Sequence, residues 1–407
     1  MTVQREIKNS HWKDVDLRSI LLFVRNGLSV KNGGRGSGLP ITRIETISAG
    51  EVNPSRVGFA DLDETGAGDY MLETGDLLFS HINSTEHIGK CAIYEGVPDK
   101  LVHGMNLLCL RPDKSYVFPR YLFHFLRHRL FKDQLARIIK PAVNQASVTI
   151  SDLSTLRITL PPLPDQVHIA AVLDKADSIR LKHEQALTLA NQFLRAVFLD
   201  RFGDPQTNSK GVPMVPIKRL AQVVTGNTPP RNRPDYYGQG VDWVKSDNLG
   251  APDHYVTKTT EQLSVSGQSV ARLAPVGSTL ITCIAGSPSS IGNAALADRE
   301  VAFNQQINAV IPSAEVDPAF LYCQFLVGKA LIQRASTNSM KGMVTKRKFE
   351  EILFLNPPAS DQRQFGRVFF RVVEHLRHVR QATDQSKELF ASLSQRAFTD
   401  GLALHVR

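Results

Sequence analysis

Two long stretches of the chain, residues 164–202 and 360–407, carry apolar residues in the alternating four-three spacing of a coiled-coil helix. Neither Pro nor Gly interrupts the first stretch between Pro164 and Gly203, which leaves room for ~38 helical residues, or about 57 Å of helix. A stripe held over about five heptads favours pairing between helices. The competing interpretation is that each helix packs only on its own domain.

We therefore predict that the two helices pair as an antiparallel coiled coil. Polar residues within the stripe are expected to fix the register; they are Arg180, His183, Thr383 and Ser386. The apolar seam is expected to consist of Ile169, Leu173, Ala176, Leu187, Leu194, Val197, Phe365, Phe369, Val372, Leu376, Phe390 and Leu393.

A much longer period indicates that the chain repeats itself. Residues 160–166 (LPPLPDQ) and 356–362 (NPPASDQ) share a Pro-Pro pair and an Asp-Gln pair in the same register. Upstream of each, short apolar stretches bounded by Gly indicate strands, and residues 121–139 and 320–334 have the periodicity of amphipathic helices. Several matches in one order favour a duplicated domain over chance similarity.

The repeat predicts an α+β fold in which two tandem mixed α/β units are each followed by a long helix. Gly- and Pro-rich stretches near the start of each unit, residues 32–40 and 226–234, are expected to form surface loops. The expected division is a first domain at residues 1–163, a first spacer helix at 164–202, a second domain at 203–359, and a second spacer helix with the C-terminal tail at 360–407.

Composition narrows the class of protein. A length of 407 residues suits two or three domains, and 42% hydrophobic with 21% charged residues excludes global disorder. No window approaches the ~18–20 apolar residues of a membrane span, and residues 1–8 lack the apolar segment of a secretory signal. Four cysteines lie far apart without a C-x-x-C pair, so we expect a reducing, cytoplasmic location. The net charge of +9 favours a polyanionic partner.

No motif in the sequence assembles a reaction centre. Residues 356–359 (NPPA) match the Asn-Pro-Pro-aromatic motif of amino-methylating DNA methyltransferases, but Ala359 cannot stack on a flipped base. The first repeat has Leu160 where the second has Asn356, so the feature that both share is a Pro-Pro hinge between strand and helix. Phosphate-cradling Gly-rich motifs with the required spacing do not occur.

The histidines give no convincing metal site. His124 and His128 lack the glutamate of a zinc-binding H-E-x-x-H helix, and we interpret them as a surface pair. His81, His87 and Cys91 have no evident fourth ligand, so we interpret them as core or loop residues.

Three segments in the middle of the chain resemble a known family. Residues 160–166, 169–177 and 198–204 look like the central region of type I restriction–modification specificity subunits. Residues 226–230 (GNTPP), followed by Tyr236-Tyr237-Gly238 and by residues 241–244 (VDWV), resemble the opening of the target-recognition domains of that family. The first unit has a variant opening at residues 39–44 (LPITRI). The duplicated plan covers nearly the whole chain.

The resemblance implies a non-catalytic DNA-binding subunit. Two target-recognition domains would each read one half of a split sequence in double-stranded DNA, and the paired helices would set the gap between the halves. Methylation subunits would dock on the helical region with S-adenosylmethionine, and a motor–nuclease subunit would join with ATP and Mg²⁺. This chain itself would bind no cofactor and no membrane. Two alternatives stay open, namely a methyltransferase or nuclease with disguised motifs and a DNA-binding scaffold without sequence preference.

Candidate DNA contacts follow from residue type, because Arg and Lys bind phosphates while Arg and Asn can also read base edges. In the second unit we predict a reader at Arg231, Arg233, Tyr236, Tyr237, Lys245 and Asn248, and a backbone clamp at Lys341, Lys346, Arg347 and Lys348. In the first unit we predict contacts at Arg35, Lys140, Asn144, Gln145 and Ser147. The alternative for the clamp is a merely solvated basic loop.

Overall fold

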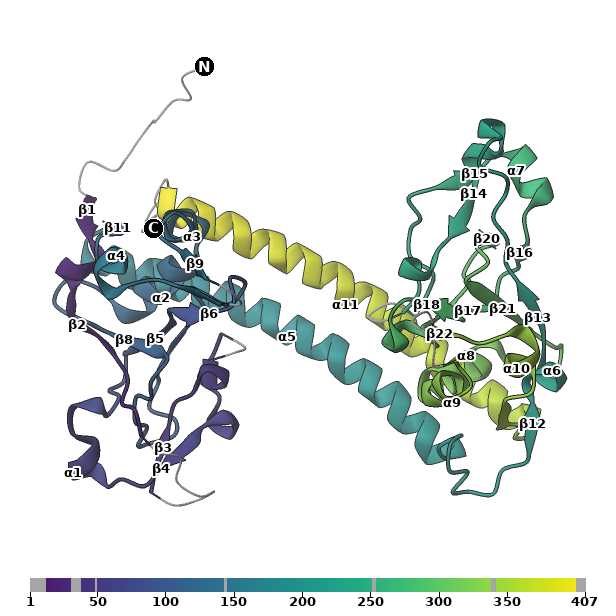
Figure 1. The fold of residues 1–407 in the computed structure, drawn as a ribbon, viewed down its shortest axis with the longest axis horizontal. Coiled ribbons are helices and arrows are strands. Elements are labelled where there is room, and N and C mark those ends of the chain that lie inside the picture. The colour runs from purple at the N-terminus through teal and green to yellow at the C-terminus, as the bar shows by residue number, and fades with distance from the viewer. Residues whose placement is uncertain are drawn as a thin grey trace, which may run out of the picture. The chain divides into compact units, whose positions relative to one another are not determined.

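The computed structural model describes residues 12–30, 38–47, 50–142, 145–250, 254–337 and 342–399. The chain divides into two compact units (Figure 1). Unit 1 comprises Met1–Lys182 and Thr383–Arg407, and unit 2 comprises His183–Ala382. The predicted division followed the order of the chain, whereas the compact units are discontinuous, because each long helix contributes one half to each unit.

The elements of unit 1 are mostly short. Its strands are β1 Lys13–Asp16, β2 Leu21–Asn26, β3 Leu39–Ile41, β4 Gly58–Ala60, β5 Leu77–Ser80, β6 Ile82–Asn83, β7 Cys91–Ile93, β8 Leu107–Pro112, β9 Lys140–Ala142, β10 Gln145–Ser147 and β11 Arg157–Leu160. Its short helices are α1 Glu64–Ala67, α2 Pro119–Arg127, α3 Arg129–Ala136 and α4 Ile150–Ser154, with 3-10 turns at Leu17–Ile20, Ile44–Ile47, Pro54–Arg56 and Gly68–Tyr70.

A four-stranded antiparallel sheet in the order β2-β8-β5-β7 forms the centre of unit 1. All four positions of β5 are buried, because apolar side chains cover both of its faces. Phe79 packs edge-on against Phe131, with ring centroids 6.2 Å apart, while Leu78 belongs to a separate core cluster with Tyr94. Smaller sheets pair β1 with β11, β3 with β4, and β10 with both β6 and β9.

Unit 2 contains a comparable set of elements. Its strands are β12 Met214–Pro216, β13 Ala221–Thr225, β14 Tyr237–Val244, β15 Gln262–Leu263, β16 Leu273–Ala274, β17 Thr279–Thr282, β18 Ile284–Ala285, β19 Ala294–Leu296, β20 Val301–Phe303, β21 Ile307–Pro312, β22 Gly342–Met343 and β23 Leu353–Leu355. Its short helices are α6 Ile217–Leu220, α7 Val265–Val270, α8 Pro318–Val327, α9 Lys329–Arg334 and α10 Lys346–Glu350, with 3-10 turns at Pro234–Tyr236, Ser246–Asn248 and Pro288–Ser290.

The strand order of the two units confirms the duplication. The central sheet of unit 2 runs β13-β21-β17-β19, which repeats the order β2-β8-β5-β7 position by position along the chain. The pair β12-β23 corresponds to β1-β11, and β18-β22 corresponds to β6-β10. In both units three short helices follow the last central strand and precede the closing strand. The predicted α+β fold with two tandem units is therefore correct.

Each of the two short amphipathic helices predicted from the sequence is broken in the structure. His128 separates α2 from α3 because its backbone is extended and its Nδ1 accepts a hydrogen bond from the backbone N–H of Leu130 at 3.3 Å. Gly328 separates α8 from α9 at the corresponding place. Apolar periodicity continues across both breaks, so it could not reveal them.

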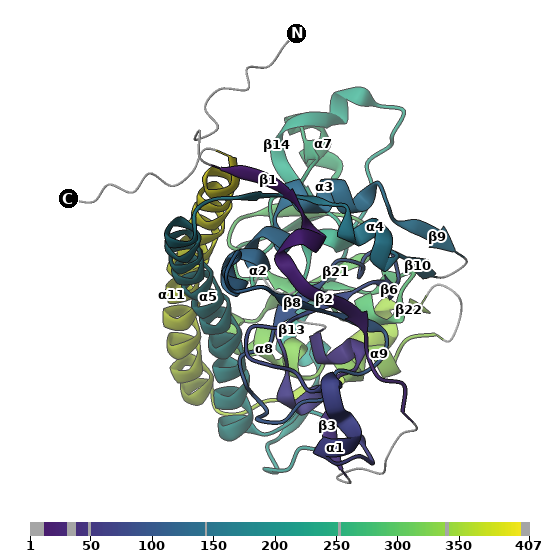
Figure 2. The ribbon, with the colours of Figure 1, turned by 90° about the vertical axis from the view of Figure 1, so that its left-hand side faces the viewer.

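The two long helices, α5 Leu163–Phe202 and α11 Ala359–Thr399, pair antiparallel. In unit 1 the first half of α5 packs with the second half of α11, where the Arg180 guanidinium lies 5.9 Å from the ring centroid of Phe390. In unit 2 the second half of α5 packs with the first half of α11, where the Phe198 and Phe365 rings are 5.5 Å apart. Figures 1 and 2 show the paired halves of the two helices side by side within each unit. Gly203, with a φ of 80°, ends α5.

The predicted seam residues differ in how deeply they are buried. Seven of them are buried, namely Ile169, Leu173, Ala176, Leu194, Phe365, Phe369 and Leu376. The other five are half-buried, namely Leu187, Val197, Val372, Phe390 and Leu393. Several of these side chains also contribute to the core of the adjacent unit, so pairing and packing on the domain occur together.

Two carboxylates anchor α5 to α2 inside unit 1. Asp174 accepts hydrogen bonds from Arg120 Nε at 3.0 Å and pairs with His124 Nε2 at 2.7 Å. Asp177, one turn on, pairs with Arg127 at 3.2 Å and with Arg180 at 2.6 Å. Burial alone would raise the pKa of Asp177, but hydrogen bonds and charges from the two guanidinium groups outweigh it and hold the pKa below its ordinary value.

We expect Asp177→Asn to destabilise unit 1 by about 1–3 kcal/mol, because it removes the negative charge and leaves one acceptor oxygen where Arg127 and Arg180 now bind two. A carboxyl group with a lowered folded-state pKa stabilises the fold above the unfolded pKa of about 3.9 and loses that effect as the pH falls. The difference between wild type and variant should therefore be full at pH 7 and shrink below about pH 4. Denaturant midpoints of the full chain measure it, with Asp384→Asn, an exposed position of α11, as the control.

Candidate nucleic-acid interface

The predicted reader of unit 2 is organised around an aromatic platform on β14. Trp243 is buried and its backbone N–H donates to the carbonyl of Glu261 at 3.1 Å, which joins β14 to the segment before β15. The ring of Tyr237 lies edge-on to Trp243 at 6.0 Å, and its hydroxyl donates to the carbonyl of Pro229. The guanidinium of Arg231 lies 4.5 Å from the Tyr237 centroid and 4.8 Å from that of Trp243.

Glu261 joins two cations of the predicted reader. Its carboxylate accepts from both terminal nitrogens of Arg231, at 2.9 and 3.3 Å, and it also pairs with Lys245. The Lys245 ammonium lies 5.2 Å from the Trp243 ring, on the same platform. Hydrogen bonds from Arg231 and Lys245 lower the pKa of Glu261 to about 2, so the carboxylate is charged at neutral pH. The sequence prediction included both cations but missed the acid.

Arg233 and Tyr236 form a second, more local arrangement. Arg233 makes two hydrogen bonds with Asp235, at 2.8 and 2.9 Å, and its guanidinium lies 4.7 Å from the Tyr236 ring centroid. Both ends of this ion pair are about half exposed, with 55% and 50% of the side-chain surfaces open. In an exposed ion pair of this kind, the arginine can easily exchange its carboxylate partner for another anion.

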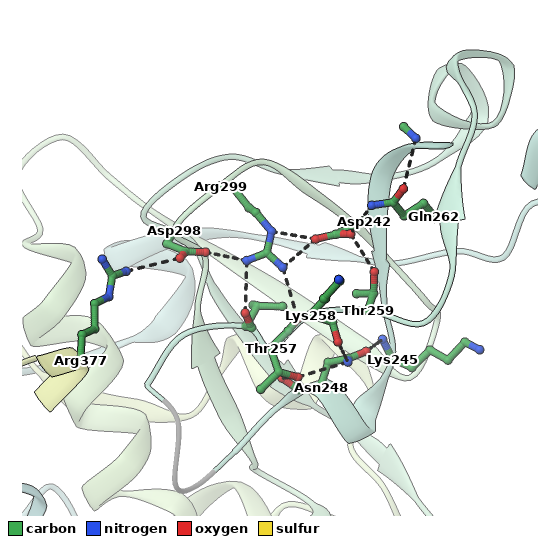
Figure 3. Close-up of polar contacts among 12 residues, drawn as sticks. Asp242, Lys245, Asn248, Thr257, Lys258, Thr259, Gln262, Asp298, Arg299 and Arg377 are labelled. Carbon is green, nitrogen blue, oxygen red and sulfur yellow. Dashed lines mark hydrogen bonds and ion pairs between the residues drawn. The ribbon is translucent and has the colours of Figure 1, made fainter. Parts of the chain in front are cut away.

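Polar side chains form a network around Asp242 on β14 (Figure 3). Asp242 on β14 accepts hydrogen bonds from Thr259 at 2.8 Å, Gln262 at 2.9 Å and Arg299 at 2.7 Å. Arg299 also contacts Asp298 at 2.7 Å. Burial opposes the charge on Asp242, but these hydrogen bonds lower its pKa overall. Asp242 and Arg299 were absent from the predicted site, and nothing in the local sequence connects them.

The side chain of Asn248 makes hydrogen bonds to residues of its own and a neighbouring loop. Its side-chain oxygen accepts from the Lys245 backbone N–H at 3.0 Å, and its amide nitrogen donates to Thr257 and to the carbonyl of Lys258, both at 3.2 Å (Figure 3). The amide thus fixes the segment that follows Trp243. A direct role of Asn248 in reading a base stays a prediction, and it would require some of these bonds to open.

The predicted clamp of unit 2 falls mainly on α10. Thr345 caps this helix through its hydroxyl, and Lys346, Arg347 and Lys348 are all exposed. Lys346 contacts Glu350 at 3.6 Å. Arg347 and Lys348 line an open cavity of about 650 Å³ that also includes Arg334. The fourth predicted clamp residue, Lys341, lies outside the described residues.

In unit 1 the structure describes three of the five predicted contacts. Lys140 on β9 is exposed and pairs with Asp152 at 2.7 Å. On the neighbouring strand β10, Gln145 is exposed and Ser147 is half-buried. Arg35 and Asn144 lie outside the described residues.

The residues that resemble catalytic or metal-binding motifs make contacts that support the fold. Residues 356–359 form the turn from β23 into α11, where the backbone N–H of Asn356 donates to the carbonyl of Pro213 at 2.7 Å. The interpretation of His124 and His128 as a surface pair is wrong, because both are buried, and His124 binds Asp174, which is distant in sequence. Within the described part of the chain, no three His, Cys, Asp or Glu side chains are grouped to hold a metal ion. No helix there combines the length and apolarity needed to cross a membrane.

These features define a class of protein: a duplicated scaffold whose two units share a pair of long antiparallel helices and whose second unit carries basic and aromatic side chains around β14. The family profile for the type I restriction modification DNA specificity domain matches twice, at residues 9–190 and 210–383. The chain therefore belongs to the family of type I restriction–modification specificity subunits.

Relatives and solved structures agree with this assignment. The MjaX type I restriction enzyme specificity subunit of Methanocaldococcus jannaschii is 30% identical over 380 residues, which cover 88% of this chain and 85% of the relative. The EcoKI specificity subunit of Escherichia coli K12 is 30% identical over 209 residues, which cover 48% of this chain and 44% of the relative. A crystal structure of the S subunit from M. genitalium covers 98% of this chain and 99% of its own, with a TM-score of 0.65 at 12% identity, and therefore supports the fold.

Proposed function

We propose that each recognition domain reads one half of a bipartite sequence in double-stranded DNA and that the chain performs no catalysis itself. The observation that carries the proposal is the repeated frame, β2-β8-β5-β7 in one unit and β13-β21-β17-β19 in the other, joined by helices that pass from unit to unit. Two equivalent frames that present different loops are suited to two different half-sites.

Reading and clamping are assigned to different parts of unit 2. Arg231, Lys245 and the aromatic platform lie on and beside β14, whereas the cations of α10 belong to a separate helix. Arginine can bind guanine through two parallel hydrogen bonds, which makes the platform the reader. Phosphate contacts add affinity without sequence information, which makes α10 the clamp.

The paired helices are proposed to set the gap between the half-sites. The 40 residues of α5 correspond to about 60 Å at 1.5 Å per residue. Equivalent major-groove faces on one side of a duplex recur every ~34–36 Å, so a rod of this length can span more than one turn. Each of the two helices contributes residues to both units, so either helix can set the distance between the half-sites.

Partner subunits are proposed to supply the chemistry. Methylation subunits would carry S-adenosylmethionine, and a motor–nuclease subunit would carry ATP and Mg²⁺. Exposed apolar side chains on the long helices support docking there; they include Leu189 at 54% and Phe193 at 51% exposed on α5, and Phe370 at 43% on α11. We expect Phe193→Ser to reduce copurification of a methylation subunit, with the exposed polar substitution Gln192→Ser as the control.

One genomic experiment tests the function. Methylated adenines are mapped in host DNA with the gene present and with the gene deleted. We expect a split motif to be methylated only when the gene is present. Methylation by the purified chain alone would instead establish an enzyme, and DNA binding that is indifferent to sequence would establish a scaffold.

Lys346→Ala is expected to weaken DNA binding by a similar factor on all sequences, because the clamp touches phosphates. Losing one phosphate contact should lower the slope of log K against log salt by about 0.9. Titration of target and unrelated duplexes at several salt concentrations measures both effects. Lys210→Ala, in the turn after α5, is the control. A loss confined to the target duplex would contradict the assignment of α10 as a clamp.

A further inference from the structure

Glu261 pairs with two cations of the predicted reader that come from different segments of the chain. Arg231 lies in the loop before β14, Lys245 follows β14, and Glu261 immediately precedes β15, so one carboxylate joins three segments. Arg233 with Asp235 and Lys346 with Glu350 are instead short-range pairs within one turn or helix. About half of the Arg231 side chain and a third of the Lys245 and Glu261 side chains are exposed, so DNA can reach all three.

We propose that Glu261 is a specificity-determining residue that keeps Arg231 and Lys245 from binding phosphates on unrelated DNA. The inference rests on the proposed DNA-reading function and deepens it. A phosphate that approaches the platform meets the negative charge of Glu261 and must displace it from two cations. Binding that depends on the backbone alone is therefore weakened at this position, although the loop is rich in basic side chains.

A suitable base pair removes this obstacle. The exocyclic amino group of cytosine or adenine can donate to the Glu261 carboxylate in the major groove, and Arg231 can then turn to acceptors such as N7 and O6 of guanine. Each hydrogen bond that opens in the protein is replaced by one to a base, whereas a phosphate offers the carboxylate no donor. The exchange is thus balanced where the bases place a donor opposite Glu261 and acceptors opposite Arg231, and it is not balanced on a phosphate.

The aromatic platform keeps the released arginine in place. Arg231 lies within 5 Å of the centroids of both Tyr237 and Trp243, and a guanidinium retains such contacts when its anion changes. The backbone bond from Trp243 to Glu261 fixes the acid on the same platform. Arg231 and Glu261 can therefore exchange partners without movement of β14.

Glu261→Gln tests the proposal because it keeps the shape of the side chain and removes its charge. The full-length chain is titrated with a duplex that carries the mapped target and with a scrambled duplex of the same composition. We expect the variant to bind the scrambled duplex about tenfold more tightly, with a salt slope steeper by up to ~1.8 for two released cations. The ratio of target to scrambled affinity should fall accordingly. Glu315→Gln, in the turn between β21 and α8, makes the same change in charge elsewhere in unit 2.

A double variant distinguishes the proposed effect of Glu261 on Arg231 from a general effect of charge. Arg231→Ala combined with Glu261→Gln should lose most of the gain on scrambled DNA, because one of the two cations is absent. The proposal is overturned if Glu261→Gln leaves scrambled-DNA affinity unchanged, if Glu315→Gln gives the same gain, or if the double variant retains the whole gain. A wild-type chain without sequence preference would instead refute the proposed function itself.

Discussion

Methylation of the bipartite target should be lost in the Leu187→Pro variant. Proline at this position removes the backbone N–H that bonds to the carbonyl four residues earlier and clashes with that turn, at a cost of about 3 kcal/mol or more. Leu187 lies in α5 just beyond the boundary between the units at Lys182 and His183. A kink there changes the path of the rod while the buried ends of α5 stay anchored, through Leu173 in unit 1 and Phe198 in unit 2.

The Leu187→Pro substitution leaves the predicted DNA-reading surfaces unchanged, so binding and spacing should be affected differently. Each half-site should still be bound, whereas the split motif at its original gap should no longer be methylated. Genome-wide mapping of methylated adenines measures this, and solution scattering shows whether the rod has bent. Leu187→Ala keeps the helix and loses only a half-buried side chain, so it should retain methylation. A normal pattern of methylation in the proline variant would refute the role of α5 as a spacer.

The long helices and the duplication could be predicted from the sequence because the patterns that specify them are periodic. The seam of α5 and α11 repeats every seven residues, and the segments at residues 160–166 and 356–362 mark the same turn in each repeat. Gln166 and Gln362 show why that turn is retained. Each accepts a hydrogen bond from the backbone N–H of a residue just before α2 or α8, namely Phe118 or Asp317, and donates to the carbonyl of the first proline of its own Pro-Pro pair.

The interface was predicted less completely because its partners are distant in sequence. Arg231 and Lys245 stand among basic and aromatic residues whose clustering is visible in the local sequence. Glu261 reaches them only because β15 pairs with β14. His124 was misplaced on the surface for the same reason, since its partner Asp174 lies on another helix. Periodicity specifies which face of an element is apolar, whereas the pairing of polar side chains depends on the tertiary arrangement.

The two units share a frame and differ in what they add to it. Between β13 and β17 the chain of unit 2 inserts β14, β15 and β16, which with β20 form a four-stranded sheet that carries the platform. In the corresponding interval between β2 and β5, the described residues of unit 1 form the two-stranded sheet β3-β4. In each unit, side chains of the shared strands and of the long helices belong to one core cluster. The unequal insertions therefore give the two units different surfaces beside the shared strands.

Replacing the reader segment at residues 225–250 should therefore change one half of the target and leave the other half unchanged. The replacement is the equivalent segment of a relative with a different target, with Tyr237, Asp242 and Trp243 kept because they support the platform. The exchanged side chains then include the exposed Arg231 and Arg233. Mapping of methylated adenines should return a motif with a new half-site at the original gap length.

The unchanged half-site is an internal control, because it shows that unit 1 and the spacer helices still work. Asn248→Ala is a narrower variant of the same experiment. It removes the hydrogen bonds to Thr257 and Lys258 and should alter only the half-site of unit 2. If the replacement leaves the motif as it was, the segment around β14 does not read DNA. If both halves change, the two domains do not read their half-sites independently.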